Sequence, residues 1–90
     1  MSYALVVEKD ALLDFVKIKK SGDKASLKKL RQILDELEIN PYEGTGNPEQ
    51  LKHQLSGFWS RRINKKDRLI YEIIEEPDKM VVVISALGHY

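Results

Sequence analysis

The hydrophobic pattern of this chain changes its period near Phe58, and that change limits the folds open to it. Between residues 11 and 39, apolar side chains recur every three or four positions, as they do along one face of a helix. From Phe58 onward they alternate every second position in short runs separated by turn residues, which is typical of strands. The sequence therefore predicts a single α+β domain, residues 1–90, with helices before most of its strands.

The helical part follows a short apolar run, Tyr3–Val7, which predicts a first strand. Asp10 then offers an N-cap for a first helix. One face of this helix is formed by Leu12, Phe15, Val16 and Lys19. Residues 21–23, Ser-Gly-Asp, end it and cap a second helix, which stops at Asn40-Pro41. The apolar stripe of the second helix consists of Leu27, Leu30, Leu34 and Leu37.

Residues 41–48 have the composition of a loop. The glycines of Gly44-x-Gly46 suggest a turn that cradles a phosphate, but no strand leads into them and a third glycine is missing. A loop that crosses from the helices to the sheet is therefore favoured. At its end, Asn47 followed by proline predicts a short helical turn through Gln54.

Three strands complete the chain: residues 58–63, Leu69–Ile74 and Met80–Ser85, with turns at 64–67 and 76–79. The last strand is apolar on both faces, so we expect it in the interior of the sheet. The order β-α-α-β-β-β predicts an antiparallel-dominated sheet with the two helices packed on one face.

A focused positive patch lies between Glu49 and Arg68. Six Lys and Arg residues against two acids give this span +4, although the whole chain carries only +1. These cations are Lys52, Arg61, Arg62, Lys65, Lys66 and Arg68. Such a patch concentrates phosphates, whatever the net charge of the whole chain.

Strand parity separates the two adjacent arginines. Arg61 shares a face with Trp59 and Ile63, whereas Arg62 shares the other face with Ser60. The two cannot both face one site from a regular strand. The alternative is that both are solvated charges at the edge of the sheet. Trp59 is favoured as half-buried core over a base-stacking platform.

Glu49 and Arg68 are the candidates for chemistry within the patch. The planar fork of Arg68 suits bidentate phosphate binding and the charge that develops in phosphoryl transfer, although an exposed rim residue is the alternative. Glu49 follows Pro48 in a predicted first turn, where the helix dipole alone favours an acid. It is also a lone carboxylate beside Lys52 that can accept a proton.

His53 and His89 are the only histidines, they lack metal-ligand spacing, and the chain has no cysteine, so we expect no metal and no cofactor. His89 is either a solvated tail residue or a proton donor near neutrality. Tyr90 adds a stacking face and a phenolic donor. Because no secretion signal or bilayer-length apolar run is present, we expect a cytoplasmic protein without a membrane partner.

The run NPEQLKHQLSGFWSRRI, followed by DRLIY and a terminal HY, resembles the YoeB family of bacterial toxins. These are small RelE-like ribonucleases that cut messenger RNA on the ribosome. The resemblance is tight over residues 41–71 and at the last two residues. It implies a RelE-like fold and the toxin of a type II toxin–antitoxin system, a metal-independent mRNA interferase that inhibits translation. The implied partners are a YefM-like antitoxin, the ribosome and messenger RNA, and a homodimer stays open.

The resemblance also implies a role for each matching residue. Glu49 is the general base, Arg68 stabilises the transition-state charge, His89 is the general acid, and Tyr90 and Arg62 position the substrate. The RNA contacts it implies are Lys52, His53, Arg62, Lys65 and Lys66.

Three departures from the family pattern stand out. The first helix lacks the tryptophan and tyrosine that are common there, Asp67 replaces a frequent histidine before Arg68, and Gly88 replaces a bulkier residue before His-Tyr. Asp67 is a neighbouring acid that could pair with Arg68, and Gly88 loosens the tail. The alternative function is a non-catalytic RNA- or ribosome-binding module whose basic hairpin only docks phosphates.

Overall fold

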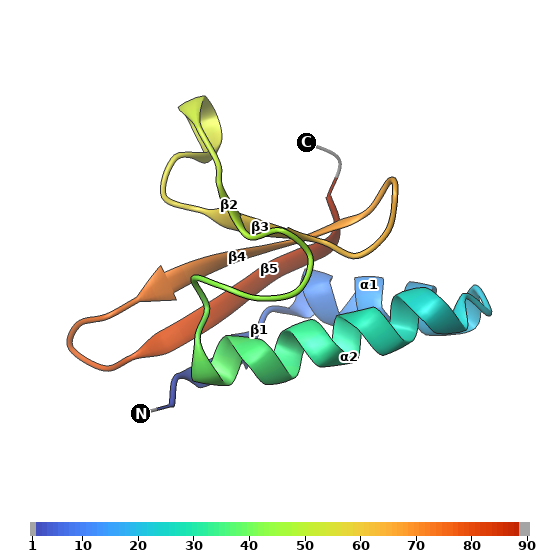
Figure 1. The fold of residues 1–90 in the computed structure, drawn as a ribbon, viewed down its shortest axis with the longest axis horizontal. Coiled ribbons are helices and arrows are strands. Elements are labelled where there is room, and N and C mark those ends of the chain that lie inside the picture. Colours follow the sequence, from blue (N-terminus) through green and yellow to red (C-terminus); the bar gives the residue numbers. More distant parts are fainter. Residues whose placement is uncertain (1, 89–90) are drawn as a thin grey trace.

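Two helices cover one face of a five-stranded sheet and leave the other face open (Figure 1). The computed structural model describes residues 2–88. Its elements are β1 (Ala4–Val7), α1 (Lys9–Lys20), α2 (Lys24–Ile39), β2 (Glu49–Gln50), the 3₁₀ turn η1 (His53–Leu55), β3 (Trp59–Arg62), β4 (Arg68–Ile74) and β5 (Met80–Gly88). The predicted α+β class and the layer of two helices are confirmed. No helix within residues 2–88 is long and apolar enough to span a membrane.

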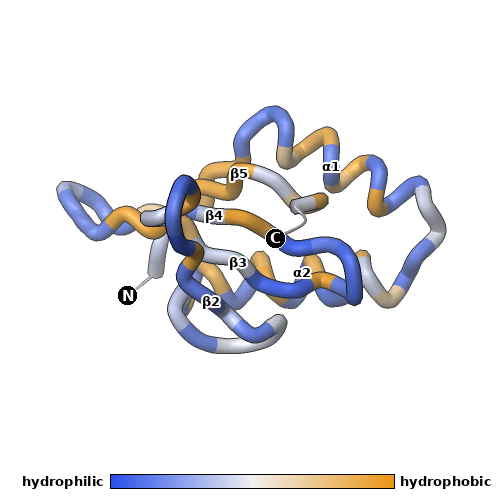
Figure 2. Tube along the Cα trace, turned by 90° about the horizontal axis from the view of Figure 1, so that it is seen from above, coloured by the Kyte–Doolittle hydropathy of each residue, from blue (hydrophilic) through white to orange (hydrophobic). Residues whose placement is uncertain are grey.

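The strands are arranged in the order β1-β5-β4-β3-β2. Strands β3, β4 and β5 form the predicted antiparallel meander, and β1 joins β5 in parallel. Strand β5 is therefore interior, as its apolar faces predicted. Figure 2 shows that β4 and β5 carry most of the hydrophobic colour of the sheet, whereas the turn between β3 and β4 is hydrophilic.

Helix α1 is rotated relative to the prediction. It begins two residues earlier, with Glu8 at the N-cap, so Asp10 lies in the first turn and the predicted N-cap is wrong. Its buried residues are Ala11 and Ile18, while Leu12 and Val16 of the predicted face are exposed. The carboxylate of Asp14 accepts a hydrogen bond from the Ala86 backbone of β5 at 3.0 Å. This bond lies on the same side as Ala11 and Ile18 and turns that side toward the sheet.

Helix α2 follows its prediction more closely. The side chain of Asp23 caps it by accepting a hydrogen bond from the Ser26 amide at 3.0 Å. Leu30, Ile33 and Leu37 are buried against the sheet, whereas the other two leucines of the stripe are only partly buried.

The segment after the long loop is a strand, so the helical turn predicted from Asn47 to Gln54 is wrong. Glu49 and Gln50 pair antiparallel with Ser60 and Trp59. The amide of Arg62 donates to the Gly46 carbonyl at 2.6 Å, and the amide of Leu51 donates to the Phe58 carbonyl at 2.9 Å. These bonds hold the segment beside β3. The short 3₁₀ turn η1 comes between β2 and β3.

Candidate functional site

Glu49 and Arg68 meet on the open face of the sheet. An Oε1 oxygen of Glu49 lies 3.1 Å from Nη1 of Arg68, which also lies 3.4 Å from the hydroxyl of Ser60. Glu49 comes from the edge strand β2 and Arg68 from the start of β4, with β3 between them. The Arg68 side chain is 19% exposed and that of Glu49 is 56% exposed. A carboxylate and a half-buried guanidinium are thus fixed side by side and remain accessible.

Arg62 is the immediate neighbour of Arg68 on this face. The two arginines are directly opposite each other across β3 and β4, and Arg62 is exposed. Like charges in this position repel, so an anion between them is favoured. Glu49 already supplies one negative group, and a phosphate is a second group that the pair can bind.

Arg61 points the other way, toward α2, as strand parity predicted. Its side chain is 0% exposed, and its Nη1 lies 2.6 Å from Oε1 of Glu36. Its aliphatic stem and its guanidinium are both buried. Burial acts to raise the pKa of Glu36, yet hydrogen bonds from Thr45 and Arg61 together lower it below its ordinary value.

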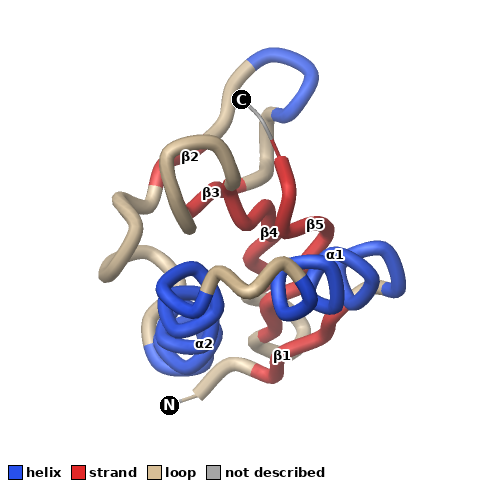
Figure 3. The backbone as a smooth tube through the Cα atoms, turned by 90° about the vertical axis from the view of Figure 1, so that its right-hand side faces the viewer, coloured by secondary structure: helices blue, strands red, loops and turns tan. Residues whose placement is uncertain are grey.

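Lys52 and His53 lie beyond β2, at and just before η1, and both are exposed. His53 has a positive φ of 60°. In Figures 1 and 3 this segment projects from the sheet on the side away from α1 and α2. The two predicted contact residues therefore flank the open face from its β2 edge.

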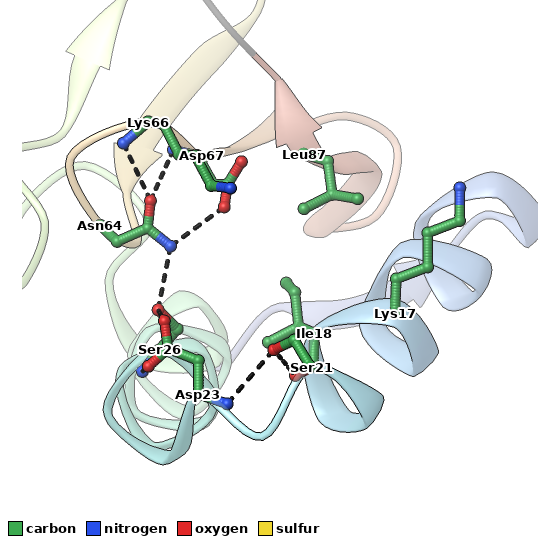
Figure 4. Close-up of a pocket in the computed structure, with 9 residues that line it drawn as sticks. All are labelled: Lys17, Ile18, Ser21, Asp23, Ser26, Asn64, Lys66, Asp67 and Leu87. Atoms are coloured by element: carbon green, nitrogen blue, oxygen red, sulfur yellow. Dashed lines mark hydrogen bonds between the residues drawn. The ribbon is translucent and has the colours of Figure 1, made fainter.

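Lys65 and Lys66 are exposed in the turn between β3 and β4. Asn64 holds this turn: its Oδ1 accepts the amides of Lys66 and Asp67, at 2.9 and 2.7 Å, and its Nδ2 donates to Ser26 at 2.9 Å. Figure 4 shows this network at a pocket of about 400 Å³ between the turn and the start of α2. The side chains of Asp23, Ser26, Asn64 and Asp67 in its lining are hydrogen-bonded to one another, and Glu49 and Arg68 lie outside it.

Asp67 does not take the role that its position suggested. It is buried, and its carboxylate accepts a hydrogen bond from Asn64 at 3.0 Å. The ion-pair partner of Arg68 is Glu49, on another strand. The expected pairing of Asp67 with Arg68 is therefore wrong.

Trp59 and Tyr71 belong to the covered face. Tyr71 is buried, and its hydroxyl donates to the Pro41 carbonyl at 2.8 Å. Trp59 is half-buried and packs edge-to-face on Tyr42 at 5.5 Å between ring centroids. A hydrogen bond to Glu75 is the main cause that raises the pKa of Tyr42 to about 12. The prediction that Trp59 is half-buried core is confirmed.

The remaining candidates, His89 and Tyr90, lie outside the described residues. Gly88, which precedes them, pairs with Arg68 across β5 and β4. Sequence reasoning missed Ser60 as a neighbour of Arg68, although parity placed it on the face of Arg62. Within residues 2–88, no three His, Cys, Asp or Glu side chains come together as potential metal ligands.

Comparison with known proteins identifies the family. A family model described as "YoeB-like toxin of bacterial type II toxin-antitoxin system" matches residues 7–90. The chain belongs to the YoeB-like toxin family. Toxin YoeB of Escherichia coli strain CFT073 is 43% identical over 68 residues, which cover 76% of this chain and 77% of that protein. Toxin YoeB of Synechocystis is 42% identical over 69 residues, or 77% of each chain.

Solved structures of YoeB-like proteins share the fold. A YoeB/ParE toxin from Agrobacterium tumefaciens has a TM-score of 0.84 at 28% identity and covers 97% of this chain and 99% of its own. The YoeB dimer from Staphylococcus aureus has a TM-score of 0.82 at 32% identity, with both chains fully covered. A YoeB–YefM complex from the same organism has a TM-score of 0.78 at 30% identity, again with full coverage. The RelE-like fold is confirmed.

Proposed function

We propose that this chain is an endoribonuclease that cleaves messenger RNA on the ribosome and thereby inhibits translation. The observation that carries the proposal is the ion pair of Glu49 and Arg68, 3.1 Å apart on the open face, with Arg62 as their neighbour. The pair combines a proton acceptor with a phosphate-binding fork, and it lies in the basic span of the chain. Membership of the YoeB-like toxin family supports the same assignment.

The reaction is attack of a ribose 2′-hydroxyl on the adjacent phosphodiester. Glu49 takes the proton of the 2′-hydroxyl as the bond from O2′ to phosphorus forms. Arg68 donates hydrogen bonds to the phosphoryl oxygens, whose charge grows in the transition state. The bond from phosphorus to O5′ then breaks, and the products are a 2′,3′-cyclic phosphate and a 5′-hydroxyl.

The proton that O5′ needs comes from His89 in this proposal, and Tyr90 and Arg62 position the substrate. The pairing of Gly88 with Arg68 supports the assignment, because it brings the end of β5 to the strand that holds the phosphate-binding arginine. Histidine titrates near neutrality and so can serve as a general acid under physiological conditions.

The surrounding cations hold the RNA without taking part in the chemistry. Lys52 and His53 flank the face on one side, and Lys65 and Lys66 lie in the exposed turn on the other. Phosphate contacts of this kind orient a strand and make its binding dependent on salt. Ribosomal and messenger RNA are the proposed ligands.

A YefM-like antitoxin is the proposed protein partner. A relative at 30% identity was solved as a YoeB–YefM complex, and another at 32% identity as a dimer. The basic span fits an acidic or amphipathic segment laid over the open face. We also propose a homodimer of this chain, because the relative at 32% identity was solved as a dimer.

The identity of the cleaved ends tests the function directly. The protein is incubated with a defined messenger RNA on purified ribosomes, and the new ends are mapped chemically. We expect a 2′,3′-cyclic phosphate and a 5′-hydroxyl, and the same ends from ribosome-free RNA in EDTA, formed more slowly. Ends that carry a 5′-phosphate would contradict the mechanism. Binding without any cleavage would identify a non-catalytic ribosome-binding module.

A further inference from the structure

Glu49 is held in place by more than the pairing of its own strand. Strand β2 has two residues, and a strand of that length cannot fix its register by itself. Nevertheless Glu49 is opposite Ser60 and within 3.1 Å of Arg68. The loop of residues 40–47 leads directly into β2, so whatever fixes this loop also fixes Glu49.

Arg61 binds that loop from underneath. Its Nη2 donates to the carbonyls of Asn40 and Glu43, at 3.0 and 2.8 Å, and its Nη1 donates to the carbonyl of Thr45 at 3.4 Å. The same Nη1 pairs with Glu36 of α2, and Nε donates to the Tyr71 hydroxyl at 3.2 Å. Both terminal nitrogens of this fully buried guanidinium therefore bind the loop, and Nε anchors the side chain to β4.

Glu36 binds the loop from the other side. Its Oε1 accepts the amide of Thr45 at 2.8 Å, and its Oε2 accepts the Thr45 hydroxyl at 2.6 Å. The loop runs so close that a Cβ on Gly44 would lie 2.2 Å from Oε1 of Glu36. A Cβ on Gly46 would lie 2.7 Å from the carbonyl of Arg62. Gly44 thus allows the loop to close around the Arg61–Glu36 pair, and Gly46 allows it to approach the backbone of β3.

We propose that the buried Arg61–Glu36 pair positions Glu49 by clamping the 40–47 loop against β3. The clamp holds the loop at Thr45, and the Arg62 amide holds the next residue, Gly46, so the chain enters β2 in one register. Arg61 and Glu36 are positioning residues, since neither reaches the open face. The kinetic part of this inference rests on the proposed function, in which Glu49 is the base.

Amide hydrogen exchange tests the clamp without any assay of activity. Glu36→Gln weakens the pair, and Glu38→Gln makes the same chemical change at an exposed position of α2. We expect the amides of Thr45, Leu51 and Arg62 to exchange several-fold faster in Glu36→Gln, while amides of β5 keep their protection. Unchanged exchange at all three amides would overturn the clamp. If Glu36→Gln does not fold, Thr45→Ala replaces it with the same expectation.

A double-mutant cycle with Glu49→Gln then tests whether the clamp acts through Glu49. We expect Glu36→Gln to lower kcat on ribosome-bound messenger RNA by about 10²-fold, the loss typical of a displaced catalytic group, with KM nearly unchanged. In a Glu49→Gln background the same change should cost almost nothing more. Losses that multiply would overturn the inference. A wild-type rate for Glu49→Gln alone would instead refute the proposed function and leave the exchange result to decide the clamp.

Discussion

Arg61 and Arg62 are adjacent in the sequence but belong to two different regions of the molecule. Arg61 lies on the covered face, where its guanidinium is buried and binds Glu36, three carbonyls and a tyrosine hydroxyl. Arg62 lies on the open face, where it is exposed and opposite Arg68. All guanidinium nitrogens of Arg61 are hydrogen-bonded within the protein. On the open face, by contrast, the half-buried guanidinium of Arg68 lies beside the exposed carboxylate of Glu49. Positive charge alone therefore does not indicate a ligand site. Hydrogen-bond donors that remain accessible to solvent do indicate one.

Replacing the two arginines by alanine should separate the regions most strongly. Arg61→Ala leaves the Glu36 carboxylate without its positive partner and the loop carbonyls without their donor, so we expect it to lower the free energy of unfolding by about 3–5 kcal/mol. Arg62→Ala should leave stability nearly unchanged and weaken RNA binding. Urea denaturation of both variants measures the difference. Equal stability of the two would contradict the structural role of Arg61.

The proposed acid gives the next largest effect, this time on activity. We expect His89→Gln to slow single-turnover cleavage by about 10²–10⁴-fold, because glutamine keeps a hydrogen bond but supplies no useful proton. Tyr90→Phe should be less impaired, and both proteins should stay folded. A wild-type rate for His89→Gln would mean that water or the ribosome protonates O5′.

Arg68→Lys tests whether the open face needs a fork or only a charge. Lysine keeps the positive charge but cannot bind a phosphate bidentately, so we expect about a 10²-fold loss in cleavage. The matched change Arg62→Lys should cost less, because in the proposed mechanism Arg62 only positions the RNA. Rates at saturating enzyme decide this, and full activity of Arg68→Lys would reduce its role to electrostatic attraction.

The smallest effect is expected in the turn between β3 and β4. Changing both Lys65 and Lys66 to glutamate should weaken RNA or ribosome binding and flatten its salt dependence, without unfolding the domain. Binding measured over a series of salt concentrations gives the slope. An unchanged slope would show that the turn does not contact phosphates.

The sequence predicted the features that depend on local periodicity. The alternation from Phe58 placed Arg61 and Arg62 on opposite faces, and the apolar character of β5 placed it inside the sheet. It did not reveal that Glu36, far back on α2, is the partner of Arg61. The helical turn expected at Asn47 became strand β2, because hydrogen bonds to Phe58 and Arg62 override local preference.

The rotation of α1 has the same kind of cause. Its periodicity fits more than one face, and a hydrogen bond between Asp14 and Ala86, distant in sequence, accompanies the choice of face. For the site, family resemblance implied the proposed roles of Glu49 and Arg68, and the structure shows their contact. The local sequence pattern does not predict the long-range polar contacts of this fold.

The cleavage rate of Glu49→Gln tests the central claim most directly, namely that the ion pair on the open face performs the chemistry. It is measured under single-turnover conditions on ribosome-bound messenger RNA. Glu76→Gln, exposed in the turn between β4 and β5, is the matched control. Loss of a general base predicts a rate about 10²–10⁴-fold lower for Glu49→Gln and a wild-type rate for the control. A folded Glu49→Gln protein that cleaves as fast as the wild type would contradict the account.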